Sequence, residues 1–342
     1  MNHINNYRLL SVLLFLFTTG LLAPSLLMAQ ETPATKEQVR EKDFLSTIFK
    51  DDPAYVFAYF MGSGDGLHLM YSYDGLLWKT ANDGQILLKP TVGKAKLMRD
   101  PSIVKDHKGV FHMVWTTGWT ENNIGYASST DLINWSEQRE LPVMAHEPEV
   151  RNTWAPELYY HKASRTFYIF WASTIPGRFP VVGSAESDYN HRMYYTTTKD
   201  FKTFTPTKLF YDPGFNVIDA FIIKEKCQYY MFVKNETLEP VEKNIRVTSS
   251  RKLTKFPTTV SAPLTGKEWA EGPTVLKVGK YTYMYWDKYR NHRYGAMRCK
   301  SLKKGEWEDV SDMIRFPAGV RHGTAFKVKA DIIHGLQSLT EE

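Results

Sequence analysis

The sequence predicts an all-β fold: a five-bladed β-propeller that is closed by the C-terminal strand pairing with the N-terminal blade. Three observations lead to this prediction. A unit of two strands and a turn recurs five times, helical periodicity is nearly absent from residue 54 to 316, and the first unit lacks a strand that the far end of the chain can supply. Repetition of one small β unit is typical of propellers, whose blades are antiparallel sheets around a central channel.

The five repeated strand pairs begin with strands rich in β-branched and aromatic residues, which pleated sheets favour. These strands are 56–60, 110–115, 166–171, 228–232 and 281–286. Each pair ends in a small-residue turn that closes with an aromatic side chain. The closing aromatics are Trp78, Trp135, Phe204, Phe256 and, in a looser copy, Trp307, at intervals of 57, 69, 52 and 51 residues. A β-sandwich is the alternative, but it gives no reason for one turn to recur.

A further short strand precedes each of the last four pairs, at 98–104, 153–159, 217–223 and 270–276. No such strand precedes the first pair, whereas residues 321–328 provide one at the other end of the chain. A propeller closes its ring when one terminus completes the blade that the other terminus begins. The missing strand therefore favours the propeller.

Composition narrows the class of protein. The 342 residues are 23% charged, 43% hydrophobic and 14% aromatic, which excludes intrinsic disorder. Only two cysteines occur, so a disulfide scaffold is excluded, and the pairing of Cys227 and Cys299 stays open. The formal net charge of +6 comes from lysines and arginines scattered among acids. Without a dense basic run, we expect no nucleic-acid partner.

The N-terminus has the pattern of a secretory signal peptide. Arg8 precedes the apolar run 9–17, and small residues lead to Ala29. An uncleaved membrane anchor is the alternative, but Pro24 and Ser25 interrupt the run before it reaches the roughly 20 apolar residues of a span. We expect a secreted or periplasmic protein that has no membrane contact once the signal is removed. The predicted organisation is a signal peptide at 1–29, a linker at 30–53, the propeller catalytic domain at 54–330 and a C-terminal tail at 331–342.

Candidate functional residues lie at the starts of the inner strands, which converge on the channel. Aligning the repeats places five residues in one position, namely Asp100, Ala155, Asp219, Glu271 and His322. Crowding three carboxylates is costly and separates their pKa values, an arrangement typical of catalysis or of cation binding. The structural alternative is that these acids cap strand ends or pair with Arg99 and Arg321.

The motifs around these positions resemble those of glycoside hydrolase family 43, in the same order, over residues 97 to 328. They are Arg-Asp-Pro-Ser-Ile at 99–103, Trp-Ala-Pro-Glu at 154–157, Ile-Asp-Ala-Phe at 218–221, Glu-Gly-Pro at 271–273 and Arg-His-Gly-Thr at 321–324. The resemblance implies a five-bladed enzyme that removes arabinose, xylose or related sugars from plant polysaccharides or oligosaccharides.

The resemblance also implies roles for single residues. Asp100 would be the general base, Glu271 the general acid, and Asp219 the carboxylate that orients Glu271 and raises its pKa. Inverting hydrolysis needs such an acid and base about 6.5–9.5 Å apart. His322 corresponds to a histidine that in many members helps to hold a calcium ion or its waters. A structural calcium ion in the channel is therefore compatible with the resemblance, and no cofactor is required.

The remaining candidates would bind the sugar. Trp154, Trp119 and Phe221 would offer ring faces to sugar C–H groups, with packing between blades as the alternative. Arg293 would donate to sugar hydroxyls unless it makes a surface ion pair. Glu157, two residues beyond Ala155, is expected to face the channel in a supporting polar role.

The sequence is compatible with three alternatives to an exo-acting inverting glycosidase. The first is a catalytically weak propeller that binds glycans. The second is a transferase or phosphorylase, although a phosphorylase should have more basic residues at the channel mouth. The third is a retaining fructan-type glycosidase, in which Arg-Asp-Pro is the middle motif and Asp52-Pro53 would have to carry the nucleophile.

Overall fold

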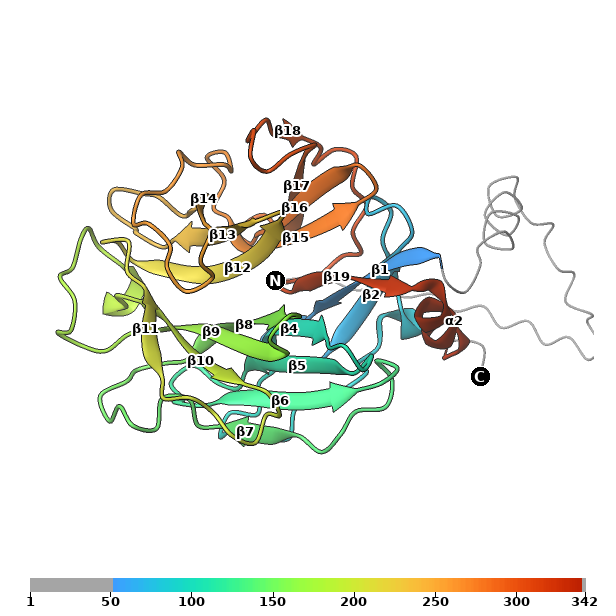
Figure 1. The fold of residues 1–342 in the computed structure, drawn as a ribbon, viewed down its shortest axis with the longest axis horizontal. Helices are drawn as coiled ribbons and strands as arrows, with labels where there is room; N and C mark the ends of the chain where they lie inside the picture. The colour runs from blue at the N-terminus through green and yellow to red at the C-terminus, as the bar shows by residue number, and fades with distance from the viewer. Residues whose placement is uncertain (1–51, 340–342) are drawn as a thin grey trace, which may run out of the picture. The chain divides into compact units, whose positions relative to one another are not determined.

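The computed structural model describes residues 52–339, and within that range it contains five antiparallel sheets and one α-helix. Figure 1 shows the sheets following one another in chain order around a common centre. The predicted signal peptide at 1–29, nearly all of the predicted linker and residues 340–342 lie outside the described residues. No helix in the described part of the chain is long and apolar enough to cross a membrane.

The first blade is built from both ends of the chain. Its strands, in order from the inside outward, are β19 (Thr324–Lys329), β1 (Pro53–Tyr59), β2 (His68–Ser72) and β3 (Lys79–Thr80). The second blade contains β4 (Arg99–Lys105), β5 (Phe111–Thr116), β6 (Ile124–Ser129) and β7 (Arg139–Leu141). The third contains β8 (Trp154–His161), β9 (Thr166–Ser173), β10 (Arg192–Thr198) and β11 (Lys208–Tyr211).

The last two blades complete the ring. The fourth contains only β12 (Val217–Glu225), β13 (Gln228–Asn235) and β14 (Asn244–Ser250). The fifth contains β15 (Glu271–Val278), β16 (Tyr281–Lys288), β17 (Arg293–Cys299) and β18 (Glu308–Asp309). Each inner strand contacts the next one around the channel, including β15 with β19 and β19 with β4. The predicted five-bladed propeller is therefore confirmed.

The predicted closure is also confirmed. β19 pairs with β1 in one unbroken antiparallel register from Ala58 opposite Thr324 to Pro53 opposite Lys329. Aromatic side chains reinforce this closure between the first and last blades. The Phe57 ring meets the edges of Trp78 at 5.7 Å and Tyr294 at 5.6 Å, an arrangement that stabilises beyond the buried area alone.

The recurring turn has a local cause. In its first copy the Ser72 hydroxyl accepts a hydrogen bond from the Gly75 N–H at 2.9 Å, and the Asp74 carboxylate accepts those of Leu76 and Leu77 at 2.7 and 2.9 Å. The Trp78 indole then donates to the Gly75 carbonyl at 3.1 Å. The copies that begin at Ser129 and Thr198 repeat the hydroxyl and carboxylate bonds. Side chains that satisfy their own backbone explain why the same turn recurs.

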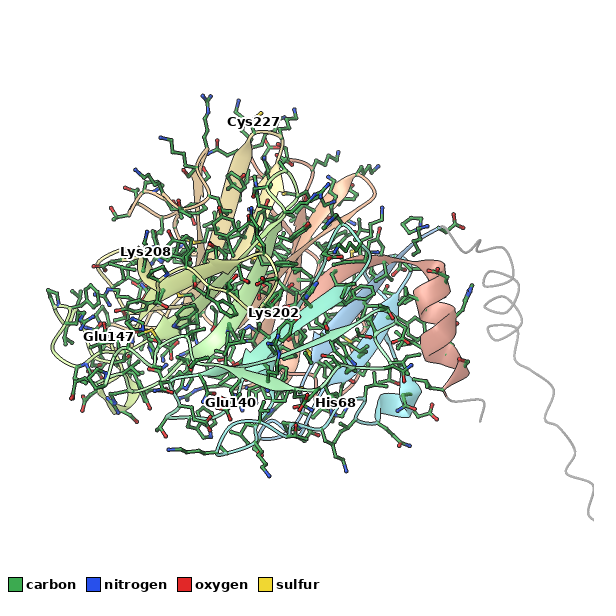
Figure 2. The ribbon with its side chains drawn as sticks, turned by 60° about the horizontal axis from the view of Figure 1, so that its bottom comes forward. His68, Glu140, Glu147, Lys202, Lys208 and Cys227 are labelled. Carbon is green, nitrogen blue, oxygen red and sulfur yellow. The ribbon has the colours of Figure 1, made fainter. Side chains whose placement is uncertain are left out.

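The structure also places the two cysteines and the C-terminal tail. Cys227 is exposed at a hairpin, at the upper edge of the molecule in Figure 2, while Cys299 is buried, and both are free thiols. The predicted tail contains a helix, α2 (Ala330–Ser338), whose Ile333 and Leu336 are buried in the core beneath the first blade. The helix therefore extends the packing of the closed blade.

Candidate functional site

The candidate site lies where four of the five inner strands break register in the same way. The ladder to the second strand shifts between residues 99 and 102, 154 and 157, 218 and 221, and 271 and 274. The residue after the first of each pair has a positive φ: 52° at Asp100, 46° at Ala155, 55° at Asp219 and 57° at Gly272. Such bulges redirect side chains, and positive φ at non-glycine residues is a strain that persists mainly at functional sites.

This register corrects the sequence alignment by one residue in the fifth blade. Glu271 was expected in the position of Asp100, Ala155 and Asp219, but Gly272 occupies it. A Cβ atom at Gly272 would lie 2.4 Å from the His322 ring, so a side chain does not fit there. Glu271 instead corresponds to Arg99. His322 precedes β19, which pairs with β1 without a bulge.

Asp100 is held from two sides at the channel mouth. The Thr116 hydroxyl donates to one carboxylate oxygen at 2.9 Å, and the His322 Nδ1 atom lies 3.4 Å from the other. The same Thr116 oxygen accepts the Ala155 N–H at 2.9 Å, which ties the second blade to the third. These contacts fix the orientation of Asp100 on its bulged strand.

Asp219 is buried next to the same histidine. Its Oδ2 atom accepts the Gly272 N–H at 2.9 Å and lies 3.9 Å from His322 Nδ1. Burial raises the pKa of Asp219 to about 6, although the positive charges of His322 and Lys234 oppose the rise. Asp219 therefore holds a proton in mildly acidic solution.

Glu271 has two cationic partners. Lys234 Nζ lies 3.3 Å from Oε2, and Arg321 Nη2 donates to Oε1 at 3.1 Å. Burial raises the pKa of Glu271, but Lys234, His322 and Arg321 outweigh it, so the pKa is lowered. The expectation that Asp219 raises the pKa of Glu271 is wrong for the protein without substrate, because the sequence did not reveal the buried Lys234.

A chain of charges extends from Glu271 to both sides. Lys234, only 2% exposed in its side chain, also lies 2.6 Å from Glu236, which in turn contacts the buried Lys243 at 2.6 Å. On the other side Arg321 donates to Asp287 at 2.8 Å. Burial raises the pKa of Asp287 to about 6, with the charge of Glu271 as the next cause.

Aromatic side chains line one side of the mouth. Trp119 is 49% exposed, and the Arg99 guanidinium lies 4.5 Å from its ring centre. The half-buried Trp154 donates its indole N–H to the Trp119 carbonyl at 3.0 Å, and the two rings meet edge to face at 5.7 Å. These contacts link both predicted sugar-binding tryptophans to the strand starts that carry Arg99 and Asp100.

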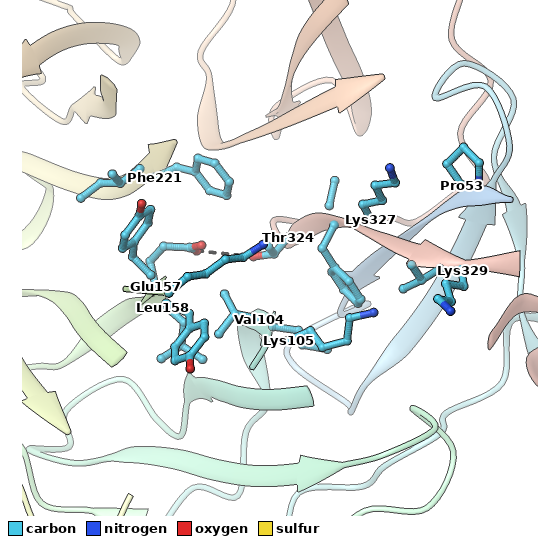
Figure 3. A pocket seen from close by; sticks show the side chains of 17 residues that line it. Pro53, Val104, Lys105, Glu157, Leu158, Phe221, Thr324, Lys327 and Lys329 are labelled. Atoms are coloured by element: carbon cyan, nitrogen blue, oxygen red, sulfur yellow. Dashed lines mark hydrogen bonds between the residues drawn. The ribbon is translucent and has the colours of Figure 1, made fainter. Parts of the chain in front are cut away.

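The other three candidates have different surroundings. Phe221 and Glu157 line a cavity farther along the channel, because the bulges place them two residues beyond Asp219 and Ala155 (Figure 3). Arg293 forms a surface ion pair with Glu268 at the start of β17. Glu157 thus faces the channel, as expected, Phe221 lies beyond the mouth, and Arg293 makes the surface ion pair that was the alternative for it.

The fructan-type alternative needs Asp52-Pro53 at the mouth. Pro53 instead begins β1, the second strand of its blade, and lines the same distant cavity as Phe221. That alternative is therefore excluded by topology.

Lys234 and Asp287 were missed, although a signal was present. The residues opposite the bulges, on the second strands, are Thr116, Ala172, Lys234 and Asp287. In the sequence these positions are visible as a lysine and an aspartate near the ends of otherwise apolar second strands.

The fit to calcium is poor for direct ligation. Within residues 52–339 no three histidine, cysteine or acidic side chains gather as metal ligands. Asp100 and Asp219 are bridged by a histidine nitrogen, whereas calcium takes six to eight oxygen ligands. Calcium held through waters at His322 stays a prediction.

Comparisons with known proteins agree with the fold. Residues 51–332 match a family model of the group related to glycosyl hydrolase family 43, described as a probable glycosyl hydrolase domain. An α-L-arabinofuranosidase from Bifidobacterium longum subsp. longum is 28% identical over 187 residues, which are 48% of this chain and only 17% of that relative.

Two solved structures are similar to this one. A thermostable family-43 glycoside hydrolase has a TM-score of 0.51 and 17% identity, covering 66% of this chain and 78% of the other. An α-L-arabinofuranosidase from Lactobacillus brevis has a TM-score of 0.51 and 18% identity, covering 63% and 72%. At these identities the likeness shows the fold.

Proposed function

Because the chain belongs to the glycosyl hydrolase family related to family 43, we propose that it is a secreted or periplasmic inverting glycosidase. Asp100 is the general base, Glu271 the general acid and Asp219 the carboxylate that positions the acid strand. The proposed substrate is a terminal pentose or related sugar of a plant-type polysaccharide or oligosaccharide. An α-L-arabinofuranoside is the first choice, since a relative of this chain is named α-L-arabinofuranosidase.

One observation carries the proposal. A single histidine nitrogen, His322 Nδ1, lies 3.4 Å from Asp100 and 3.9 Å from Asp219, and Asp219 accepts the backbone N–H of Gly272, next to Glu271. Three carboxylates from three blades are thus tied into one mouth. Packing alone gives no reason to crowd them there.

In the proposed reaction Asp100 takes a proton from a water molecule that attacks the anomeric carbon, while Glu271 gives a proton to the leaving oxygen. Glu271 must therefore be protonated when the substrate is bound. Arg321 is 20% exposed in its side chain and Lys234 only 2%, so Arg321 is the partner that a sugar hydroxyl can draw away. Loss of that ion pair, together with burial by the sugar, would raise the pKa of Glu271.

The second candidate function is glycan binding without efficient cleavage. The observation that favours it is the lowered pKa of Glu271, which leaves the proposed acid ionised in the free protein. A binding protein would keep Trp119 and the charge network but show no turnover.

The test is a screen of nitrophenyl glycosides and of arabinan, xylan and galactan fragments. Wild type is compared with Asp100→Ala, Glu271→Ala and the control Glu308→Ala, which removes an exposed acid from the outer strand β18. We expect turnover by wild type and the control, and none by the first two variants. Equal inactivity of all four proteins would favour the binding function, and full activity of Asp100→Ala would remove Asp100 from the base role.

The stereochemistry is tested on whichever substrate is cleaved. Proton NMR of the first product formed should show the anomer opposite to that of the substrate. A retained configuration would contradict an inverting Asp100–Glu271 pair.

A further inference from the structure

A cavity of about 590 Å³ lies along the later residues of the inner strands β4, β8, β12 and β19 (Figure 3). The inner strands run in the same direction, so their later residues lie farther from the mouth. Lys105 follows Asp100 by five residues on β4, which at about 3.3 Å per residue separates the two by roughly 16 Å along the strand. The inner edge of the cavity, at Glu157 and Phe221, lies near Asp219, whereas the lysines lie at its far end.

Four lysines line this cavity: Lys105, Lys162, Lys327 and Lys329. Burial lowers the pKa of Lys105, and the positive charges of Lys329 and Lys162 add to the effect while Asp331 opposes it. The lysines are thus close enough to repel one another. Lys327 and Lys329 alternate with the buried Val328 on β19, so both point away from the core on the same side of the strand.

Among the described residues that line the cavity, Glu157 is the only acid. It is 8% exposed and accepts a long hydrogen bond, 3.4 Å, from Thr324 (dashed in Figure 3). Burial raises the pKa of Glu157 to about 8, so at neutral pH its carboxyl group is protonated and adds no negative charge to the cavity. Its O–H is instead a hydrogen-bond donor within the cavity.

The walls between these polar groups are apolar, with both aliphatic and aromatic side chains. Tyr159, Tyr160, Phe221 and Phe326 contribute rings, and Ile103 and Leu158 add aliphatic surface. Rings with apolar faces suit the C–H faces of sugars, and the volume lies in the range of small-molecule sites. The lysines add the ability to bind anionic groups.

We propose that this cavity is a binding site for an anionic oligosaccharide of two or three sugar units, whose carboxylate or sulfate groups contact the lysines while its rings lie against the apolar walls. The choice of a sugar rests on the proposed function, whereas the anionic character rests on the lysines alone. Such a site would hold an acidic polysaccharide farther along the inner strands than the catalytic mouth.

The test measures the binding of trigalacturonate by calorimetry. Neutral β-1,4-galactotriose is the uncharged control ligand, and inorganic sulfate is the competitor. The protein is the full chain carrying Glu271→Ala, so that no ligand is turned over. We expect trigalacturonate to bind, galactotriose to bind at least about tenfold more weakly, and the affinity for trigalacturonate to fall as salt is added. Competition by sulfate would show that the anionic group, whether carboxylate or sulfate, is what the lysines recognise.

The double variant Lys162→Glu and Lys327→Glu reverses two exposed charges at the cavity. The control, Lys303→Glu and Lys304→Glu, makes the same change in the exposed loop before β18. We expect the first pair to weaken trigalacturonate binding by about tenfold or more at low salt and the control to leave it unchanged. Should the first pair fail to fold, Lys162→Gln with Lys327→Gln gives the same comparison.

Three results would overturn the inference: no binding of trigalacturonate, equal binding of galactotriose, or a loss of binding with Trp119→Ala but not with the lysine variants. The last result would place the ligand at the mouth. Turnover is assayed separately on wild type. Binding of trigalacturonate without any glycoside turnover would refute the proposed glycosidase activity and support this site. Glycoside turnover without trigalacturonate binding would refute only this site.

Discussion

Replacing Lys234 by methionine tests how the protonation of Glu271 is set. Methionine keeps the length of the side chain and removes its charge, 3.3 Å from the Glu271 carboxylate. At that distance, with an effective dielectric constant of about 20, the attraction is roughly 5 kcal/mol. Arg321 remains at 3.1 Å and Lys243 still pairs with Glu236. Because one pKa unit corresponds to about 1.4 kcal/mol, the lost attraction limits the change to about 3–4 units, and we expect the pKa of Glu271 to rise.

The assay is the pH dependence of kcat/KM. If Glu271 is the acid, activity is lost as it ionises, so the alkaline limb reports its pKa in the free enzyme. A cation lowers that pKa, and removing the cation must move the limb to higher pH. Lys243→Met is the matched control, because Lys243 is equally buried but contacts Glu236 and not Glu271.

Lys234 does not set the pKa of Glu271 if the alkaline limb of kcat/KM stays in place, moves to lower pH, or moves equally in Lys243→Met. Loss of a buried ion-pair partner costs about 3–5 kcal/mol of stability, so thermal unfolding is followed in parallel. If Lys234→Met does not fold, Arg321→Met should shift the limb in the same direction, since Arg321 also lowers the pKa of Glu271.

Three further predictions concern stability and sugar binding. Glu157→Gln should raise Tm relative to wild type at pH 8 and have little effect near pH 4.5. The pKa of Glu157 is about 8 in the folded protein and 4.5 without the fold, so the folded wild type loses roughly 3–5 kcal/mol of stability as pH rises from 4.5 through 8. An equal Tm difference at both pH values would contradict this. Gly272→Ala should lower the free energy of unfolding, measured with urea, by more than Gly279→Ala does. The two residues have similar φ values, 57° and 53°, but only a Cβ at 272 meets a neighbour, the His322 ring at 2.4 Å. Equal losses of about 1 kcal/mol would show that the ring moves aside. Trp119→Ala should raise KM far more than it lowers kcat and leave Tm nearly unchanged, because the side chain is 49% exposed; an unchanged KM would remove Trp119 from the sugar site.

Most of the fold was predictable because its signals are local and repeated. The turn that begins at Ser72 bonds to its own backbone within a few residues, so its copies at Ser129 and Thr198 could be recognised without tertiary information. The closure by residues 321–328 followed from counting strands per unit. The outer strand missing from the fourth blade was not predictable, because the turn at 250–256 gave no sign of it.

Part of the site was also predictable. Asp100 and Asp219 occupy the same bulge position, as their motifs indicated. Glu271 was assigned to the bulge position, which Gly272 occupies. Only a glycine fits there because the His322 ring, from another blade, lies against it, and the sequence does not show that contact. Phe221 was grouped with the aromatic residues of the mouth, because sequence spacing does not show how far a bulged strand carries its next residues along the channel.

The five blades and the residue types at the channel could be predicted from the sequence because their signals lie within each repeat, and the closure could be predicted because the first repeat lacks a strand. Which charges meet could be learned only from the folded chain. Lys234 and Arg321 come from different blades, yet both bind Glu271, and together they reverse the expected direction of its pKa shift. Electrostatic energy depends on distances of a few ångströms between groups far apart in the chain, and those distances exist only once the ring has closed.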